Sequence, residues 1–174
     1  MRLILFFLTA LCVTMAQDDF YESFEDNRNG WFLENNAERM GEISNKNYYY
    51  ENKKTPFHQS SISTVAFNQA SDFILEARIR WVSGIDNNAY GLVFQSADVT
   101  TANYSTFHIS GTGFFGIGQL VDNTYTAIKN WQQSPIINKQ GTNDLKIEKK
   151  GNVYSFFVNN KFVYSTTTIK EQGS

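Results

Sequence analysis

The amino-acid sequence predicts an all-β protein folded as a two-sheet antiparallel sandwich. Across Phe73–Val82, apolar side chains alternate with charged ones, which is the pattern of a strand that buries one face. Other short apolar or alternating runs follow one another along the chain, separated by Gly, Asn and Asp. After Ala16, no segment repeats apolar residues at helical spacing for three turns. Many short strands between turns are typical of sandwiches and barrels.

The expected strands are separated by residues that favour turns. Asn159-Asn160 divides two such runs, and asparagine tolerates the positive φ that a tight hairpin needs. Phe, Tyr and Trp make up 16% of the chain, which suits the broad packing surface of a sheet. We expect strands near Asp19–Glu25, Trp31–Glu34, Gly41–Ser44, Tyr48–Asn52, Ser61–Phe67, Phe73–Val82, Tyr90–Ala97, Tyr104–Ser110, Phe114–Val121, Thr124–Lys129, Leu145–Lys149, Tyr154–Val158 and Phe162–Ser165.

The first residues have the features of a secretory signal. Arg2 precedes an apolar run, Leu3–Val13, and small residues follow it at the positions that a signal peptidase recognises. We therefore expect residues 1–16 to be removed and the protein to be exported to the periplasm, the cell surface or the medium. The apolar run is about half of the ~20 residues that cross a membrane. The large Leu11 before Cys12 argues against a lipoprotein anchor.

Composition limits the remaining chain, residues 17–174, to a single domain with few kinds of partner. The full chain has a formal net charge of −2 and no long basic run, so no nucleic-acid partner is expected. No second apolar segment is long enough to span a membrane. Cys12 is the only cysteine, so the mature chain has no disulfide, no thiolate metal site and no cysteine nucleophile.

We expect no cofactor and no transition-metal site, because the chain has only two histidines besides its single cysteine. Calcium stays an alternative, since it needs only oxygen ligands. The same Asp and Asn side chains commonly stabilise turns by bonding to their own backbone, which is the simpler interpretation. The oxygen donors for the calcium alternative are Asp18, Asp19, Asp26, Asn27, Asp86 and Asn87.

Polar side chains on two predicted strands are the candidate ligand-binding residues. Arg78 and Arg80 lie opposite the core side of their strand, and Tyr104 shares the polar side of another strand with His108. If both strands belong to one sheet, these side chains form one surface, beside which Trp131 adds a flat ring. Planar hydrogen-bonding groups and aromatic rings suit a glycan, such as a cell-envelope polysaccharide. A solvated sheet face without a ligand would alternate in the same way.

Several segments at turns and core positions give the chain a family resemblance. These segments are Phe24–Asp26, Trp31, Asp72–Arg80, Gly84, Asn87–Phe94, Phe107–Gly113, Trp131, Ser134, Ile137, Asn143, Leu145, Gly151-Asn152 and Phe156–Asn159. With them the chain resembles concanavalin A-like and laminin-G-like domains, and the related domain of bacterial 3-keto-disaccharide hydrolase-type proteins. The resemblance implies a jelly roll over nearly the whole mature chain. It also implies a last strand beyond Ser174, so we expect a C-terminally truncated domain that lacks this strand.

The resemblance raises the question of catalysis, because laminarinase-type glycoside hydrolases share this fold. They place catalytic carboxylates at alternate positions of one strand, and no two Asp or Glu residues here are two apart. We therefore expect no catalytic residues and predict an exported, non-catalytic binding module, most consistent with a glycan ligand. One alternative is a keto-sugar or glucan hydrolase with carboxylates from separate strands, Glu76 and Asp86 being the first to test. Another is a structural, protein-binding domain of a longer envelope protein.

Overall fold

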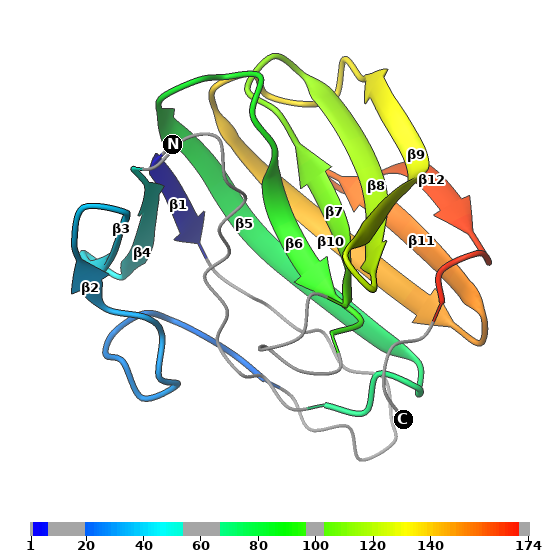
Figure 1. Ribbon diagram of the computed structural model, residues 1–174, viewed down its shortest axis with the longest axis horizontal. Helices are drawn as coiled ribbons and strands as arrows, with labels where there is room; N and C mark the ends of the chain where they lie inside the picture. Colours follow the sequence, from blue (N-terminus) through cyan, green and yellow to red (C-terminus); the bar gives the residue numbers. More distant parts are fainter. Residues whose placement is uncertain (1, 7–19, 54–66, 97–102, 171–174) are drawn as a thin grey trace.

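The protein is an antiparallel β-sandwich of two sheets (Figure 1). The computed structural model describes residues 2–6, 20–53, 67–96 and 103–170, and of residues 2–6 only the backbone. Every strand pair is antiparallel, which confirms the predicted fold class. The larger sheet has the spatial order β12 (Lys161–Thr166), β11 (Val153–Val158), β10 (Thr142–Lys150), β5 (Phe73–Ser83), β1 (Arg2–Phe6), β4 (Asn47–Asn52), β3 (Arg39–Ser44) and β2 (Glu34–Asn35).

The second sheet is smaller and packs against the β5–β10–β11 part of the first (Figure 1). Tight turns join its last strands, and similar turns close the hairpins of the larger sheet. Asp122-Asn123 and Asn159-Asn160 both have two consecutive residues at positive φ, as the asparagine pattern predicted for the second turn. The smaller sheet has the order β6 (Tyr90–Phe94), β7 (Tyr104–Ile109), β8 (Phe114–Val121) and β9 (Thr124–Gln133).

Two expected strands differ from the structure near the N-terminus. No strand forms over the described part of Asp19–Glu25, and Trp31–Glu34 contributes only the short β2. The cause is the buried carboxylate of Glu22, which accepts hydrogen bonds from the Phe24 amide and the Trp31 indole, each at 2.7 Å. These bonds hold the segment as a loop. The expected strand Ser61–Phe67 lies almost wholly outside the described residues.

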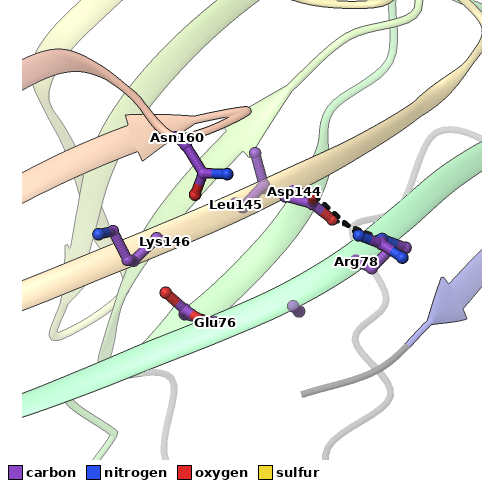
Figure 2. Close-up of a pocket in the computed structure, with 7 residues that line it drawn as sticks. Glu76, Arg78, Asp144, Leu145, Lys146 and Asn160 are labelled. Carbon is purple, nitrogen blue, oxygen red and sulfur yellow. Dashed lines mark hydrogen bonds and ion pairs between the residues drawn. The ribbon is translucent and has the colours of Figure 1, made fainter. Parts of the chain in front are cut away.

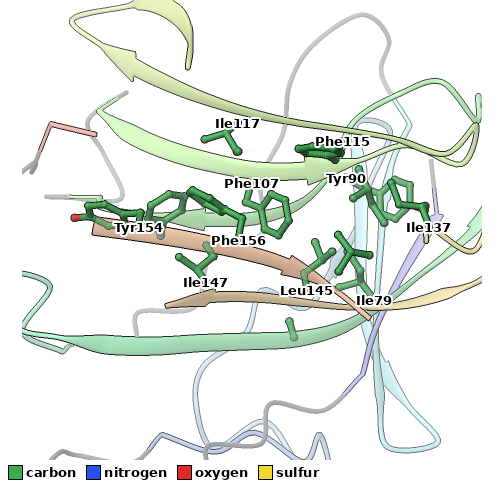
Figure 3. Close-up of a cluster of buried hydrophobic side chains, with 14 of the residues drawn as sticks. Ile79, Tyr90, Phe107, Phe115, Ile117, Ile137, Leu145, Ile147, Tyr154 and Phe156 are labelled. Carbon is green, nitrogen blue, oxygen red and sulfur yellow. The ribbon is translucent and has the colours of Figure 1, made fainter. Parts of the chain in front are cut away.

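The core lies between the two sheets and is rich in aromatic rings (Figure 3). Phe107 of β7 and Phe156 of β11 are both fully buried, with ring centroids 5.1 Å apart in an edge-to-face contact. The alternation of β5 buries Phe73, Ala77 and Ile79, and Trp81 packs against the same core as predicted. A smaller cluster of Phe24, Tyr48 and Tyr50 with Trp31 fills the β3–β4 end of the molecule.

The backbone of Arg2–Phe6 forms β1, which lies between β4 and β5 in the larger sheet. These residues belong to the segment for which the sequence predicts a removable signal, and that prediction stays untested. An apolar run without alternation suits a strand covered on both faces as well as it suits a signal. Across the described residues, there is no helix long and apolar enough to cross a membrane.

Tyr90 at the start of β6 provides a test of the core. Its side chain is 4% exposed, and its hydroxyl has no hydrogen-bond partner among the described residues. Tyr90→Phe is therefore expected to raise the free energy of unfolding at pH 7 by ~1 kcal/mol, since an unpaired buried hydroxyl is costly. Urea unfolding of both proteins measures this, and a less stable variant would contradict it.

The same hydroxyl makes stability depend on alkaline pH. Burial raises the pKa of Tyr90 from 10.0 to about 12. The folded protein thus holds this proton more tightly than the unfolded chain. The resulting contribution to the free energy of unfolding is complete below pH 10 and is lost as the pH approaches 12. Unfolding curves at pH 9 and pH 11.5 should show a smaller loss of stability in Tyr90→Phe than in the wild type.

Candidate functional site

The structure separates the five predicted site residues into two groups on opposite outer faces of the sandwich. Arg78 and Arg80 point outward from β5 in the larger sheet, where both are exposed. Tyr104, His108 and Trp131 belong to β7 and β9 in the smaller sheet. The expectation that all five form one surface is wrong, because strand alternation shows which residues point outward but not which sheet holds the strand.

On the larger sheet, Arg78 is already engaged by a carboxylate of the neighbouring strand. Its Nε donates to Asp144 Oδ1 at 2.7 Å and its Nη2 donates to Oδ2 at 3.1 Å, a two-point contact seen in Figure 2. This pair raises the pKa of Arg78 above its usual range through the hydrogen bonds and the nearby charge. Beside it lies a pocket of about 220 Å³, bounded by β5, β10 and the β11–β12 turn, hereafter the Glu76 pocket.

The Glu76 pocket bears on the hydrolase alternative, because it gathers carboxylates from two strands. Glu76 lies opposite Lys146 in the register of β5 and β10, which places it diagonally from Asp144 and Glu148. Asp144 is held by Arg78, and Glu148 accepts a 2.7 Å hydrogen bond from Lys146. Two of these three carboxylates are thus neutralised by cations of the protein. The other candidate of that alternative, Asp86, accepts a hydrogen bond from Gln140 away from the pocket.

The outer face of the smaller sheet brings together the other three predicted residues. His108 and Trp131 form an edge-to-face ring pair with centroids 4.6 Å apart, although they come from β7 and β9. His108 Nδ1 lies 3.2 Å from Thr106 Oγ1, the next outward residue on its strand. Trp131 keeps 47% of its side chain exposed. It lies inside β9, which continues to Gln133, four residues beyond the expected end of this strand.

Two glycines of β8 explain how rings from β7 and β9 can meet across the strand between them. Gly116 and Gly118 both point outward and leave the middle of this face without side chains. A Cβ on Gly116 would lie 2.5 Å from His108 Nε2, so the imidazole covers this position. A Cβ on Gly118 would meet the Tyr125 ring in the same way. The rings therefore lie close to the sheet, on a floor of backbone.

Tyr125 completes this surface and was not among the predicted residues. It is 56% exposed, and burial of its hydroxyl raises its pKa, with the neighbouring Tyr104 adding to the shift. The hydroxyl therefore stays protonated at neutral pH and can both donate and accept hydrogen bonds. The spacing of Gly116 and Gly118 within Phe114–Val121 was the available signal, since it marks a strand face without side chains. We call Tyr104, Thr106, His108, Tyr125 and Trp131 the aromatic face.

The aromatic face is almost free of formal charge. In the register of β7 to β9, the outward positions carry Tyr, Thr, His, Phe, Gly, Leu, Ala, Trp and Gln, and no Asp, Glu, Lys or Arg. The one lysine of β9, Lys129, lies instead with its Nζ 5.3 Å from the centre of the Tyr164 ring on β12. A ligand of this surface would meet aromatic rings and neutral hydrogen-bonding groups.

The residues considered for calcium are occupied or lie outside the described residues. Asp26 accepts three hydrogen bonds from Arg28, which lower the pKa of its carboxyl to about 2. Asp18 and Asp19 are not described. Within the described ranges, no three His, Cys, Asp or Glu side chains are placed to hold a metal ion. Calcium binding stays an untested alternative.

Comparisons with known proteins add little to this geometry. No protein-family model matches the chain, and no curated protein matches it. One solved structure with some likeness is the carbohydrate-binding module CBM66 from Bacillus subtilis, at 21% sequence identity and a TM-score of 0.47. The match covers 55% of this chain and 58% of that one, so the chain spans little more than half the length of its structural neighbour. The resemblance to concanavalin A-like families stays a prediction.

Proposed function

We propose that this protein is a non-catalytic carbohydrate-binding module and that the aromatic face is its binding surface. The observation that carries the proposal is the exposed ring surface on the Gly116–Gly118 floor. Trp131 and Tyr125 are large and exposed; Trp131 packs against the His108 ring, and the Tyr125 ring lies over Gly118. Sugar rings present flat C–H surfaces to aromatic rings and hydroxyls to polar groups, and this face offers both.

The charge of the aromatic face supports a neutral saccharide. With no carboxylate or guanidinium on the outward positions of β7 to β9, this face has no ion pair to offer an acidic sugar. Gly116 and Gly118 are two positions apart on one strand, a distance of ~7 Å. The rings covering them can contact successive units of a polysaccharide, so a chain should bind better than a single sugar.

Binding to neutral polysaccharides tests this proposal. The wild-type protein is expected to bind insoluble neutral glycans in a pull-down assay and to give a saturable titration with their oligosaccharides. Trp131→Ala and Tyr125→Ala are each expected to weaken binding by at least tenfold. A matched control is Phe162→Ala, which removes a ring that is 58% exposed on β12 of the other sheet.

Two results would overturn the proposal. The first is a glycan array on which the folded wild-type protein binds no saccharide above background. The second is a bound saccharide whose affinity falls no further in Trp131→Ala and Tyr125→Ala than in Phe162→Ala. The three replaced side chains are about half exposed, so we expect all variants to fold. Circular dichroism and thermal unfolding check this.

A further inference from the structure

The Glu76 pocket lies on the opposite side of the sandwich from the aromatic face. Its volume of about 220 Å³ suits a single sugar ring or one long side chain. Glu76 and Lys146 line its floor from β5 and β10, and Asn160 lies at its rim on the β11–β12 turn (Figure 2). The proposed sugar-binding surface makes no use of these residues.

The cations around the pocket are already matched to other groups. Arg78 is bound at two points by Asp144, as described above. Lys146 donates to Glu148 at 2.7 Å, and its Nζ lies 4.3 Å from the centre of the Phe157 ring. The Lys146 ammonium is therefore held by a carboxylate and an aromatic ring on the side of the pocket away from Arg78.

Neither Arg78 nor Lys146 donates a hydrogen bond to the Glu76 carboxylate. Although Glu76 faces Lys146 in the register, its side-chain carboxylate has no hydrogen bond or ion pair with any other residue that the structure describes. Its side chain is half-buried, and burial raises the pKa of its carboxyl despite the attraction of Lys146. A partly desolvated carboxylate without a hydrogen-bond donor is a site where a cation binds favourably.

We propose that the Glu76 pocket binds a primary ammonium group. The Glu76 carboxylate accepts from the ammonium, and the Asn160 side-chain carbonyl at the rim is a second acceptor. The volume of the pocket leaves room for a single amino sugar or a lysine side chain. Both ligands present the same group, so the recognition chemistry is shared and the experiment distinguishes the two sources.

The test is a titration of the full-length protein, followed by the amide signals of residues around the pocket in NMR spectra. Glucosamine and Nα-acetyl-lysine amide are the two ammonium ligands. Glucose and N-acetylglucosamine are the neutral controls, because they keep the ring and remove the charge. We expect saturable shifts of the Asn160 side-chain amide and the Lys146 backbone amide with at least one ammonium ligand, and with neither control.

Two substitutions with opposite expected effects separate binding from folding. Glu76→Gln keeps the shape of the side chain and removes its charge, and it should weaken ammonium binding at least tenfold. Lys146→Met removes the cation that faces Glu76, and it should tighten binding about threefold or more. Glu42→Gln, an exposed carboxylate on β3 of the same sheet, is the charge-matched control and should bind as the wild type does.

The outcomes are decisive in either direction. Binding that is lost in Glu76→Gln and kept in Glu42→Gln supports the ammonium site, and the better ligand identifies its source. Equal shifts with glucosamine and N-acetylglucosamine, no shifts with any ligand, or unchanged binding in Glu76→Gln would each overturn it. Because Trp131→Ala leaves this pocket intact, failure of the sugar-binding surface and failure of the ammonium site are observed separately.

Discussion

Phe107→Ala is expected to lower the free energy of unfolding by about 3–5 kcal/mol. Phe107 is fully buried at the centre of the smaller sheet and packs edge to face on Phe156 of the larger one. Removing the ring leaves a cavity between the two sheets. The loss is large, because small domains have a total free energy of unfolding of only ~5–15 kcal/mol. Urea unfolding followed by circular dichroism measures the loss.

This substitution also tests how the core supports the aromatic face. Thr106 and His108 flank Phe107 on the same strand and point to the other side. We therefore expect Phe107→Ala to weaken saccharide binding as well. If the alanine variant does not fold, the milder Phe107→Leu provides the same test in a folded protein. Phe162→Ala, which removes an exposed ring, is the control. A loss of unfolding free energy in Phe107→Ala no larger than that in Phe162→Ala would contradict this packing.

A chain that begins at Gln17 is expected to unfold at a lower temperature than the full chain and to self-associate. Without β1, the edges of β4 and β5 face each other across the space of a missing strand. Backbone groups of both strands lose their partners, and exposed edges promote pairing with other molecules. Thermal unfolding and size-exclusion chromatography of the two chains measure the effect.

The same comparison tests the two interpretations of the N-terminal segment. A synthetic peptide with the sequence of Arg2–Phe6 and added lysines should restore part of the lost stability if the strand position is real. Equal stability of both chains would show that β1 is not required, and would favour a role of this segment as a signal alone. N-terminal sequencing of the protein isolated from cells and from the medium then shows whether cleavage occurs.

The sequence predicted individual strands well wherever local pattern decides them. The alternation in Phe73–Val82 corresponds to β5, and the Asn159-Asn160 turn has the predicted positive φ values. Prediction was wrong over the described part of Asp19–Glu25, where the buried carboxylate of Glu22 accepts hydrogen bonds from residues up to nine positions away. Such bonds depend on a tertiary contact that no local pattern shows.

For the candidate site, the sequence predicted the types of residue better than their arrangement in space. Tyr104, His108 and Trp131 do lie on one outer face, but Tyr125 was missed because its contact with Gly118 depends on the pairing of β8 with β9. Arg78 was expected to face a ligand, and its guanidinium is instead bound by Asp144, 66 residues away. The sequence shows that both residues are charged, but not that their strands are neighbours.

By itself, the sequence determined the all-β class, the position of most strands and turns, and the inward or outward direction of side chains such as Phe107 and His108. Alternation and turn chemistry are local, so they can be read without the fold. Only the tertiary structure decided which strands share a sheet. That choice separated Arg78 from His108, brought Trp131 against the His108 ring, and left the Glu76 carboxylate without a partner among the described residues. Pairing between distant strands depends on packing of the whole chain.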